Sequence, residues 1–267
     1  MGLLASLMFF TRLPWWRLFT VPKEAFEHVV DWWPIVGWLT GGVMGGVFVG
    51  GLALGLSPAI SALLAIAARL LLTGALHEDG LADFCDGFGG GTSRARTLVI
   101  MKDSHIGTYG VLGLVLYIGL LWSLMTNIAG APQASSAAMW QAGTLILLFD
   151  VAGKSAASLI TGQLPYARTA DEAKNQVVYV GRSWQAWLLH SFRCALALAL
   201  PIALCVYLGL GAVVLLLPVP FIVELLLMLW MRRRLGGYTG DCCGALFLLS
   251  ELSMYMAWLV LTLNISS

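Results

Sequence analysis

The sequence predicts an all-α polytopic membrane protein with about seven transmembrane helices and an N-terminal helix that lies in the membrane interface. Of its 267 residues, 59% are hydrophobic and only 11% are charged, whereas a soluble domain has about a quarter charged residues. A soluble globule of this length needs more polar surface than the chain supplies. The Lys and Arg residues are also distributed unevenly, which gives the helices a direction through the membrane.

The first predicted element is the interfacial segment, residues 1–33, ahead of a single transmembrane helical domain over residues 34–267. Leu3, Leu7 and Phe10 share one helical face, and two tryptophans and an arginine follow. This pattern is typical of a helix lying on a membrane surface. A cleavable signal peptide is not expected, because no positive charge precedes the apolar run.

Four charge-poor blocks supply the predicted spans. A spanning helix needs roughly 20 apolar residues, so the first three blocks hold two helices each and the last holds one. The blocks are residues 34–76, 106–149, 194–231 and 244–267. Turn-forming residues mark the breaks inside the first three blocks at 55–58, 130–133 and 209–211.

The basic residues orient these spans. Twelve of the 15 Lys and Arg residues fall before the first span or in alternate connections between spans. This is the positive-inside pattern, so we expect the N-terminus and three long loops on the cytoplasmic side of a bacterial inner membrane. The remaining three, Arg69, Lys154 and Arg193, lie within or at the ends of spans. Neither the net charge of +1 nor any basic–aromatic patch indicates nucleic acid binding.

The loop from 77 to 110 is the predicted chemical site. It contains five of the 14 acidic residues, and Asp79, Asp83 and Asp86 share one face if the second span continues as a helix. Three stacked carboxylates repel one another unless a cation neutralises them, and Mg²⁺ prefers carboxylate and phosphate oxygens. A magnesium site is therefore predicted here. The alternative is a solvated acidic helix end.

Basic and glycine residues follow the acids in the same loop. Gly89, Gly90 and Gly91 precede Arg94 and Arg96. Backbone N–H groups of a glycine segment can approach a phosphate, and Arg binds its oxygens in pairs. The alternative is a flexible loop without a ligand.

Other polar residues lie inside the spans. Asp150 and Lys154 are four residues apart, and the sequence leaves open whether Lys154 pairs with Asp150 or contacts a phosphate. The segment Gly153-Lys154-Ser155 is not a P-loop, because Leu148 occupies the place of the leading glycine.

The remaining features lie in the first and last spans. Asp241, in a glycine-rich segment, is either a turn residue or a site residue, and Glu251 within the last span is a functional candidate. Gly42, Gly46 and Gly50, with Gly41, Gly45, Gly51 and Gly55 beside them, form a stripe that predicts helix packing.

Four segments carry a family resemblance. HEDGLADFCDG from His77, IMKDSHIGTYG from Ile100, LPYAR from Leu164, and GGYTGD from Gly236 with a later Glu resemble the motifs of the cobalamin synthase family, the adenosylcobinamide-GDP ribazoletransferases. The opening FFTRLP is also similar, and the match runs in order from about residue 7 to 251. The chain departs from the family at Lys154, where relatives carry Arg, and over residues 171–174.

The resemblance implies a reaction and a cofactor. The ribose 3′-hydroxyl of α-ribazole, or of its 5′-phosphate, attacks adenosylcobinamide-GDP, and GMP is released in the last steps of cobalamin biosynthesis. Such a transfer asks the protein mainly for positioning and charge neutralisation, with Mg²⁺ supplying part of the charge.

The resemblance and the residue chemistry together give a set of site residues within the membrane-embedded catalytic domain. The expected Mg²⁺ ligands are Glu78, Asp79, Asp83 and Asp86, with Asp103 as a further ligand or the general base. Asp83, Asp86 and Asp103 are also the expected catalytic residues. The expected phosphate-binding residues are His77, Arg94, Arg96, Lys102, Lys154 and Arg168. The cytoplasmic helix ends are expected to converge, bringing Lys154, Arg168 and Asp241 near the acids.

Two alternatives compete with this assignment. Asp83 to Gly87 matches the DxxDG core of CDP-alcohol phosphatidyltransferases, but Gly90 and Gly91 stand where that family carries Ala-Arg. A small-molecule transporter is the other alternative, although transporters show repeats and polar groups at mid-membrane, and here the charges gather at one face. The oligomeric state, a homo-oligomer included, is left open.

Overall fold

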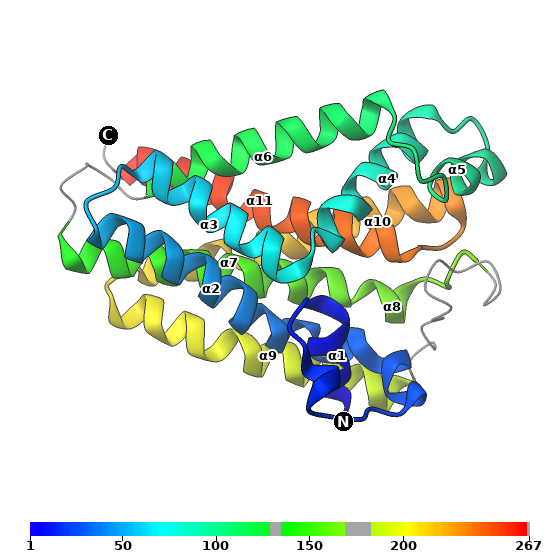
Figure 1. Ribbon diagram of the computed structural model, residues 1–267, viewed down its shortest axis with the longest axis horizontal. Coiled ribbons are helices and arrows are strands. Elements are labelled where there is room, and N and C mark those ends of the chain that lie inside the picture. The colour runs from blue at the N-terminus through cyan, green and yellow to red at the C-terminus, as the bar shows by residue number, and fades with distance from the viewer. Residues whose placement is uncertain (129–134, 169–182, 266–267) are drawn as a thin grey trace.

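The computed structural model describes residues 1–128, 135–168 and 183–265, which are almost entirely helical (Figure 1). The predicted turn at 130–133 and the departure at 171–174 lie outside these residues. The first half contains α1 (Gly2–Phe10), η1 (Trp15–Arg17), η2 (Lys23–Trp32), α2 (Trp33–Ala53), α3 (Pro58–Thr73), α4 (Leu76–Gly90) and α5 (Arg94–Ile100). The second half contains α6 (Thr108–Ile128), α7 (Ser136–Ser158), α8 (Ile160–Gln163), α9 (Trp184–Tyr207), η4 (Gly211–Leu216), α10 (Pro218–Leu235) and α11 (Gly240–Ile265).

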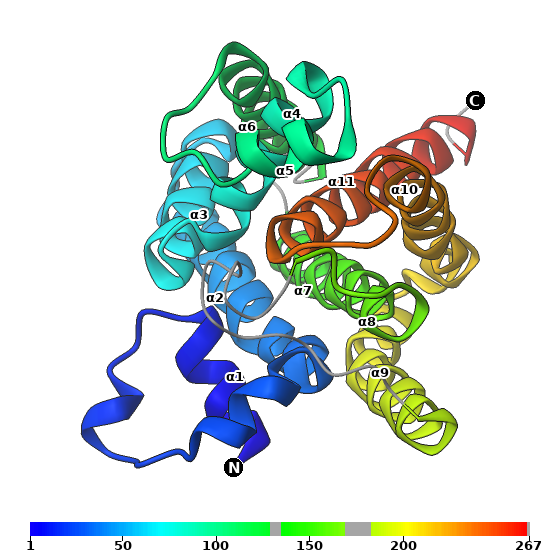
Figure 2. The same ribbon diagram turned by 90° about the vertical axis from the view of Figure 1, so that its right-hand side faces the viewer.

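The long apolar helices confirm the predicted membrane fold. Within the described residues, 6 helices are long and apolar enough to cross a membrane, or 7 if the bent pair of α3 and α4 is counted as one span. Viewed from one end of the bundle (Figure 2), α7 lies in the middle with α2 and α11 beside it. Around this centre lie α3, α4 and α6 on one side and α9 and α10 on the others.

The second span does not continue into the acidic segment as one helix. Instead α3 ends at Thr73, and α4 begins two residues after Gly74 at an angle of 91° to α3. Gly74 and Ala75 both adopt left-handed backbone conformations, with φ of 65° and 55°. Glycine takes this conformation readily. The acidic residues therefore lie on a separate helix that crosses the end of the bundle.

The N-terminal segment packs onto this same end (Figure 1). The hydroxyl of Ser6 on α1 donates to the carbonyl of Val29 on η2 at 2.5 Å. Phe10 then stacks on Trp33 at the start of α2, with 4.9 Å between ring centroids and 7° between planes. The helix expected near the N-terminus is present, and it lies against the bundle.

The glycines of α2 serve helix packing, as predicted, on one side of the stripe. A Cβ built at Gly45 would lie 2.6 Å from the carbonyl oxygen of Gly143, so Gly45 permits the close contact between α2 and α7. At Gly42 and Gly46 the same construction meets none of the described atoms within 4 Å. The packing face is therefore the row of Gly41, Gly45 and Gly51, and the row of Gly42 and Gly46 lies away from it.

Candidate active site

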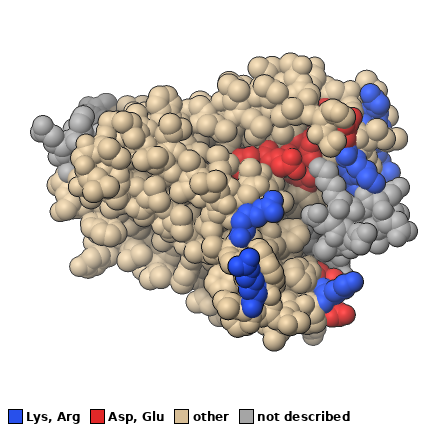
Figure 3. Space-filling model, in the orientation of Figure 1, with Lys and Arg blue, Asp and Glu red and all other residues tan. Residues whose placement is uncertain are grey.

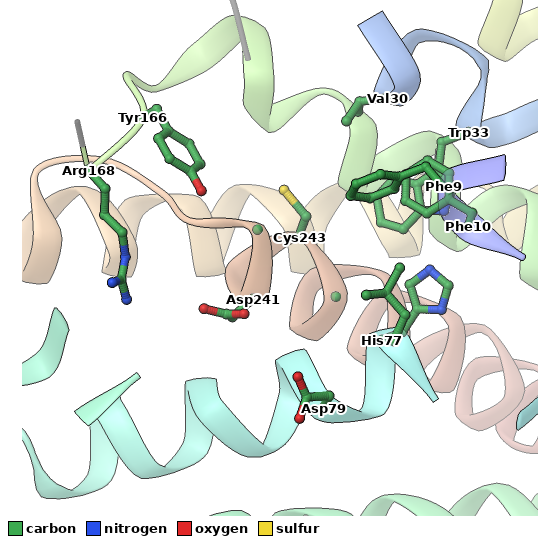
Figure 4. Close-up of a pocket in the computed structure, with 13 residues that line it drawn as sticks. Phe9, Phe10, Val30, Trp33, His77, Asp79, Tyr166, Arg168, Asp241 and Cys243 are labelled. Atoms are coloured by element: carbon green, nitrogen blue, oxygen red, sulfur yellow. The ribbon is translucent and has the colours of Figure 1, made fainter. Parts of the chain in front are cut away.

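A cavity opens where α4 and α11 begin, beside the N-terminal segment (Figure 4). Its enclosed volume is about 130 Å³. Acidic residues Asp79 and Asp241 lie in its middle, Tyr166 and Arg168 lie toward one end, and the aromatic rings of Phe9, Phe10 and Trp33 lie toward the other (Figure 4). The cavity thus has a polar end and an apolar end.

Close packing of α4 against α11 brings the two carboxylates together. A Cβ built at Gly80 would lie 3.0 Å from the carbonyl oxygen of Asp241 and 3.1 Å from its Cα. On the other helix, a Cβ at Gly244 would lie 2.9 Å from the carbonyl oxygen of His77. Because both glycines lack a side chain, the helices approach until Asp79 and Asp241 border one space.

The LPYAR segment, residues 164–168, forms the side of the cavity that carries Arg168, here called the basic wall. The N–H of Ala167 donates to the carbonyl of Tyr238 at 2.8 Å, and the N–H of Tyr238 donates to that of Pro165 at 3.1 Å. This pairing fixes the segment beside the start of α11. Arg168 is buried and donates from Nη2 to the carbonyl of Leu98 at 3.0 Å. Its guanidinium is therefore held in place before any ligand arrives.

Tyr166 is a neutral hydrogen-bonding group in this wall. Burial raises the pKa of its phenol to about 12. The hydroxyl stays protonated at physiological pH, and Figure 4 shows it pointing toward Asp241 and Cys243. It can donate to an oxygen of a ligand without carrying charge.

A second, more open cavity adjoins the first. Arg94, Lys102, Tyr166 and Arg168 line it. Tyr166 and Arg168 therefore border both cavities, so a phosphate beside Arg168 would be within reach of ligands in either one.

The acids of α4 do not all face one site. Asp79 is exposed and borders the first cavity, and Asp83 lies half-buried one turn further on. Glu78 instead turns into the bundle, where its carboxylate lies 3.8 Å from Arg69. Acidic side chains gather on this face of the molecule, with basic ones on either side (Figure 3).

Asp86 has a structural contact that the sequence did not indicate. Its two oxygens accept the N–H groups of Gly107 at 2.7 Å and Gly110 at 2.8 Å, at the start of α6. The carboxylate thereby caps α6 and ties it to α4. A metal ion would have to compete with both of these bonds.

Asp103 lies apart from both cavities, in the exposed turn between α5 and α6. It accepts the backbone N–H of His105 at 3.0 Å and contacts the His105 ring at 2.8 Å. These bonds, the backbone one first, lower the pKa of Asp103. A lowered pKa makes a carboxylate a weaker base.

The glycine run and its neighbouring arginines also have structural contacts. Gly89 and Gly90 form the last turn of α4, and Gly91 ends it by donating to the carbonyl of Gly87 at 2.9 Å. Arg94 donates to the carbonyls of Leu235 and Ala167 at 2.7 and 2.9 Å. The glycines thus terminate a helix, and Arg94 braces the basic wall.

The remaining predicted phosphate-binding residues differ in position. Lys102 borders the second cavity, and Arg96 is exposed on α5. His77 is buried with its ring stacked on Trp33 at 5.5 Å. Lys154 is fully buried and paired with Asp150, so of the two alternatives for Lys154 the ion pair is the one found. Lys154 borders neither cavity.

A buried ion cluster lies beneath the site, in the middle of the bundle. Arg69 donates to Glu251 at 2.5 Å and to the hydroxyl of Tyr117 at 2.6 Å, and it lies 3.7 Å from Asp150. Together with Glu78 and Lys154, the cluster links α3, α4, α6, α7 and α11. Buried charges require such pairing. Through Glu78, the cluster anchors the first turn of α4 and thereby positions Asp79.

The carboxylates at the cavity fit Mg²⁺ held jointly with a substrate. Among the described residues, no three His, Cys, Asp or Glu side chains form a complete metal cage. Mg²⁺ commonly binds one or two carboxylates and completes its shell with phosphate oxygens and water. Asp79 in the cavity and Asp83 one turn further along α4 could supply that kind of partial shell next to the cations of the basic wall.

The sequence did not place several of these residues in the site. Trp33, Phe9 and Phe10 form the apolar end, Tyr166 stands in the basic wall, and Arg69 anchors the ion cluster. Signals for some of them were present, because Phe9 and Phe10 open the FFTRLP motif and Tyr166 lies within LPYAR. Arg69 is the only charged residue of its apolar block, and that isolation indicated a buried partner.

Comparison with known proteins places the chain in a family. The family model for cobalamin-5-phosphate synthase matches residues 2–259. An adenosylcobinamide-GDP ribazoletransferase of Shewanella amazonensis is 36% identical, over 97% of this chain and 94% of the relative. The enzyme of that name from Leptothrix cholodnii is 37% identical over 95% and 93%, and one from Vibrio cholerae is 34% identical over 95% and 91%. No solved structure matches at a significant level.

These matches confirm the resemblance seen in the four motifs and exclude the lipid-enzyme and transporter alternatives as family assignments. They span nearly the whole chain, the N-terminal segment included. The chain therefore belongs to the cobalamin-5-phosphate synthase family of membrane transferases.

Proposed function

We propose that this protein transfers adenosylcobinamide phosphate from adenosylcobinamide-GDP to the ribose 3′-hydroxyl of α-ribazole or its 5′-phosphate. The observation that carries the proposal is the convergence of Asp79, Asp241 and Arg168, from three distant segments, on one cavity. Carboxylates beside a fixed guanidinium suit a reaction in which charged phosphates must be gathered and oriented. The names of the relatives supply the substrates.

In this reaction the 3′-oxygen of the acceptor forms a bond to the phosphorus that carries the cobinamide. The bond from this phosphorus to the bridging oxygen of the pyrophosphate breaks, and its electron pair leaves with GMP. The proton of the hydroxyl passes to a carboxylate. We assign that role to Asp241, which faces Asp79 across the cavity from a different helix (Figure 4). Arg168 and Tyr166 hold the phosphate oxygens.

Asp79, with Asp83 one turn further along α4, would hold Mg²⁺ together with substrate phosphate. When bound, the ion supplies positive charge that neutralises the pyrophosphate and the leaving oxygen. Lys102 and Arg94 add positive charge on the side of the second cavity. In the orientation predicted from the basic residues, this site faces the cytoplasm from a bacterial inner membrane.

The proposal is tested with purified protein in lipid nanodiscs, adenosylcobinamide-GDP and α-ribazole, with and without Mg²⁺. The expected products are GMP and a corrinoid with a completed nucleotide loop, detected by chromatography and mass spectrometry, only when Mg²⁺ is present. Hydrolysis of the donor without incorporation of α-ribazole would refute the transferase reaction. Repeating the assay with α-ribazole 5′-phosphate determines which acceptor is preferred.

A further inference from the structure

The cavity beside α4 has two chemically different ends, and this difference indicates the kind of ligand that it binds. Asp79, Asp241 and Arg168 make the middle and one end polar, whereas Phe9, Phe10 and Trp33 make the other end apolar (Figure 4). A ligand that fills it must therefore be polar at one end and apolar at the other. The acceptor, a benzimidazole joined to a ribose, has that character.

The size of the cavity limits it to part of one substrate. Its enclosed volume is about 130 Å³, below the roughly 300–1,000 Å³ of cavities that hold a whole small ligand. It cannot enclose a corrinoid and a second nucleotide together. The second cavity, which shares Tyr166 and Arg168, is open enough to receive the phosphates of the larger donor.

The aromatic rings at the apolar end form a rigid, prebuilt wall. Phe9 packs edge-on against Phe10 at 4.9 Å, and Phe10 stacks on Trp33 at the same distance. Trp33 in turn stacks on His77. Phe10 and Trp33 are only 4% and 1% exposed, so Phe9, which is half-buried, supplies the adaptable surface. Flat heterocyclic bases bind such walls through their faces and edges.

We propose, resting on the proposed function, that this apolar end is the subsite for the acceptor base and that Phe9 is a specificity-determining residue there. The ribose then lies between Asp79 and Asp241, with its 3′-hydroxyl toward Arg168 and the donor phosphates. A purine would bring amino and ring nitrogens that lose water at this end. Val30 and Leu76 offer no side-chain hydrogen bonds in exchange, and the ring nitrogens present, Trp33 Nε1 and His77 Nε2, are buried and held in the aromatic stack.

The test measures binding of α-ribazole alone, by isothermal titration calorimetry on the full chain in lipid nanodiscs. Phe9→Leu is expected to weaken binding about tenfold, the loss of one base–aromatic contact. Phe9→Tyr keeps the ring and should stay within about twofold of the wild type. The matched control is Phe19→Leu, because Phe19 lies in the same N-terminal segment, is exposed and borders neither cavity.

A second arm compares bases and substrates. The wild type should bind α-ribazole at least about tenfold more tightly than the corresponding adenine riboside, and Phe9→Leu should narrow that ratio. In turnover, Phe9→Leu should raise the KM for α-ribazole and leave the KM for the donor unchanged. A rise in the donor KM alone would place the donor at the apolar end and overturn the assignment.

The outcomes separate this inference from the proposed function. The subsite would be overturned if Phe9→Leu and Phe19→Leu bind α-ribazole equally well, even if the wild type performs the transfer. Conversely, a wild type that binds α-ribazole through Phe9 but forms no product would refute the transfer reaction alone. If Phe9→Leu fails to fold, its gel-filtration profile will change. The binding of α-ribazole by Phe9→Tyr and Phe9→Trp then tests the subsite, because the two variants differ in whether the ring fits it.

Discussion

Arg69 on α3 and Glu251 on α11 form an ion pair of 2.5 Å in the middle of the helix bundle. The same guanidinium lies 3.8 Å from Glu78 on α4 and 3.7 Å from Asp150 on α7. One side chain thus connects three spans to the short helix that carries Asp79. The cluster thus anchors the helix that carries Asp79, although Arg69, Asp150 and Glu251 line neither cavity.

Arg69→Met is therefore expected to destabilise the protein strongly. Removing one partner leaves buried carboxylates uncompensated, a loss of about 3–5 kcal/mol in comparable sites. Thermal unfolding in detergent, followed with a thiol-reactive dye that reports exposure of the buried cysteines, measures the effect. Arg96→Met, at an exposed site, is the control. Equal unfolding midpoints for the two variants would contradict the role given to the cluster.

Gly80→Ala should reduce turnover by more than tenfold, because a Cβ there meets the backbone of Asp241 at 3.0 Å. The added methyl requires α4 and α11 to separate by a few tenths of an ångström, and a full displacement of about 1 Å can cost about 10²-fold in rate. Gly90→Ala in the same helix is the matched control, since its Cβ would meet only a flexible side-chain atom of Ile100 at 3.5 Å. Initial rates at saturating substrate make the comparison. Similar rates for both variants would argue against a site between these helices.

Replacing Asp86 distinguishes a helix-capping role of its carboxylate from a metal-binding role. If it caps α6, Asp86→Ala should lower stability by about 0.5–2 kcal/mol and leave the Mg²⁺ concentration for half-maximal activity unchanged. If it binds the metal, that concentration should rise. Unfolding curves together with Mg²⁺ titrations of activity distinguish the two. The two bonds from Gly107 and Gly110 lead us to expect the first result.

The predicted orientation can be tested with reporter fusions. Fusions after residues 100 and 135 flank α6, so a cytoplasmic reporter should be active at the first site and a periplasmic reporter at the second. Equal signals at both sites would mean that α6 does not cross the membrane. Inverted signals would place the two cavities on the outer face, where cytoplasmic nucleotides cannot reach them.

Composition predicted the fold well because transmembrane helices are specified locally. Long uncharged blocks and the placement of Lys and Arg were sufficient to predict the spans. The 91° bend after α3 was missed, since it depends on left-handed conformations at Gly74 and Ala75, and alanine gives no signal for one. The sequence predicted packing by the glycines of α2 but not which row makes the contacts, because a helix face is chosen by its partner.

The site was predicted only in part, because the sequence does not show where each side chain points or which distant residues contact it. Glu78 and Asp79 are neighbours in sequence, yet one faces the buried cluster and the other faces the cavity. Asp86 is occupied by backbone groups more than 20 residues away, a contact without a local signal. Asp241 and Arg168 were expected near the acids and do border the cavity with Asp79. Lys154, expected with them, lies in the buried cluster.

The most direct test of the account is the rate of GMP release by Asp79→Asn, compared with Asp103→Asn and the wild type, over a range of Mg²⁺ concentrations. If the reaction takes place at the cavity, Asp79→Asn should lose on the order of 10²–10³ in rate and should require more Mg²⁺. Asp103→Asn, in the exposed turn, should retain most of its activity. Near-normal turnover by Asp79→Asn together with an inactive Asp103→Asn would place the chemistry elsewhere.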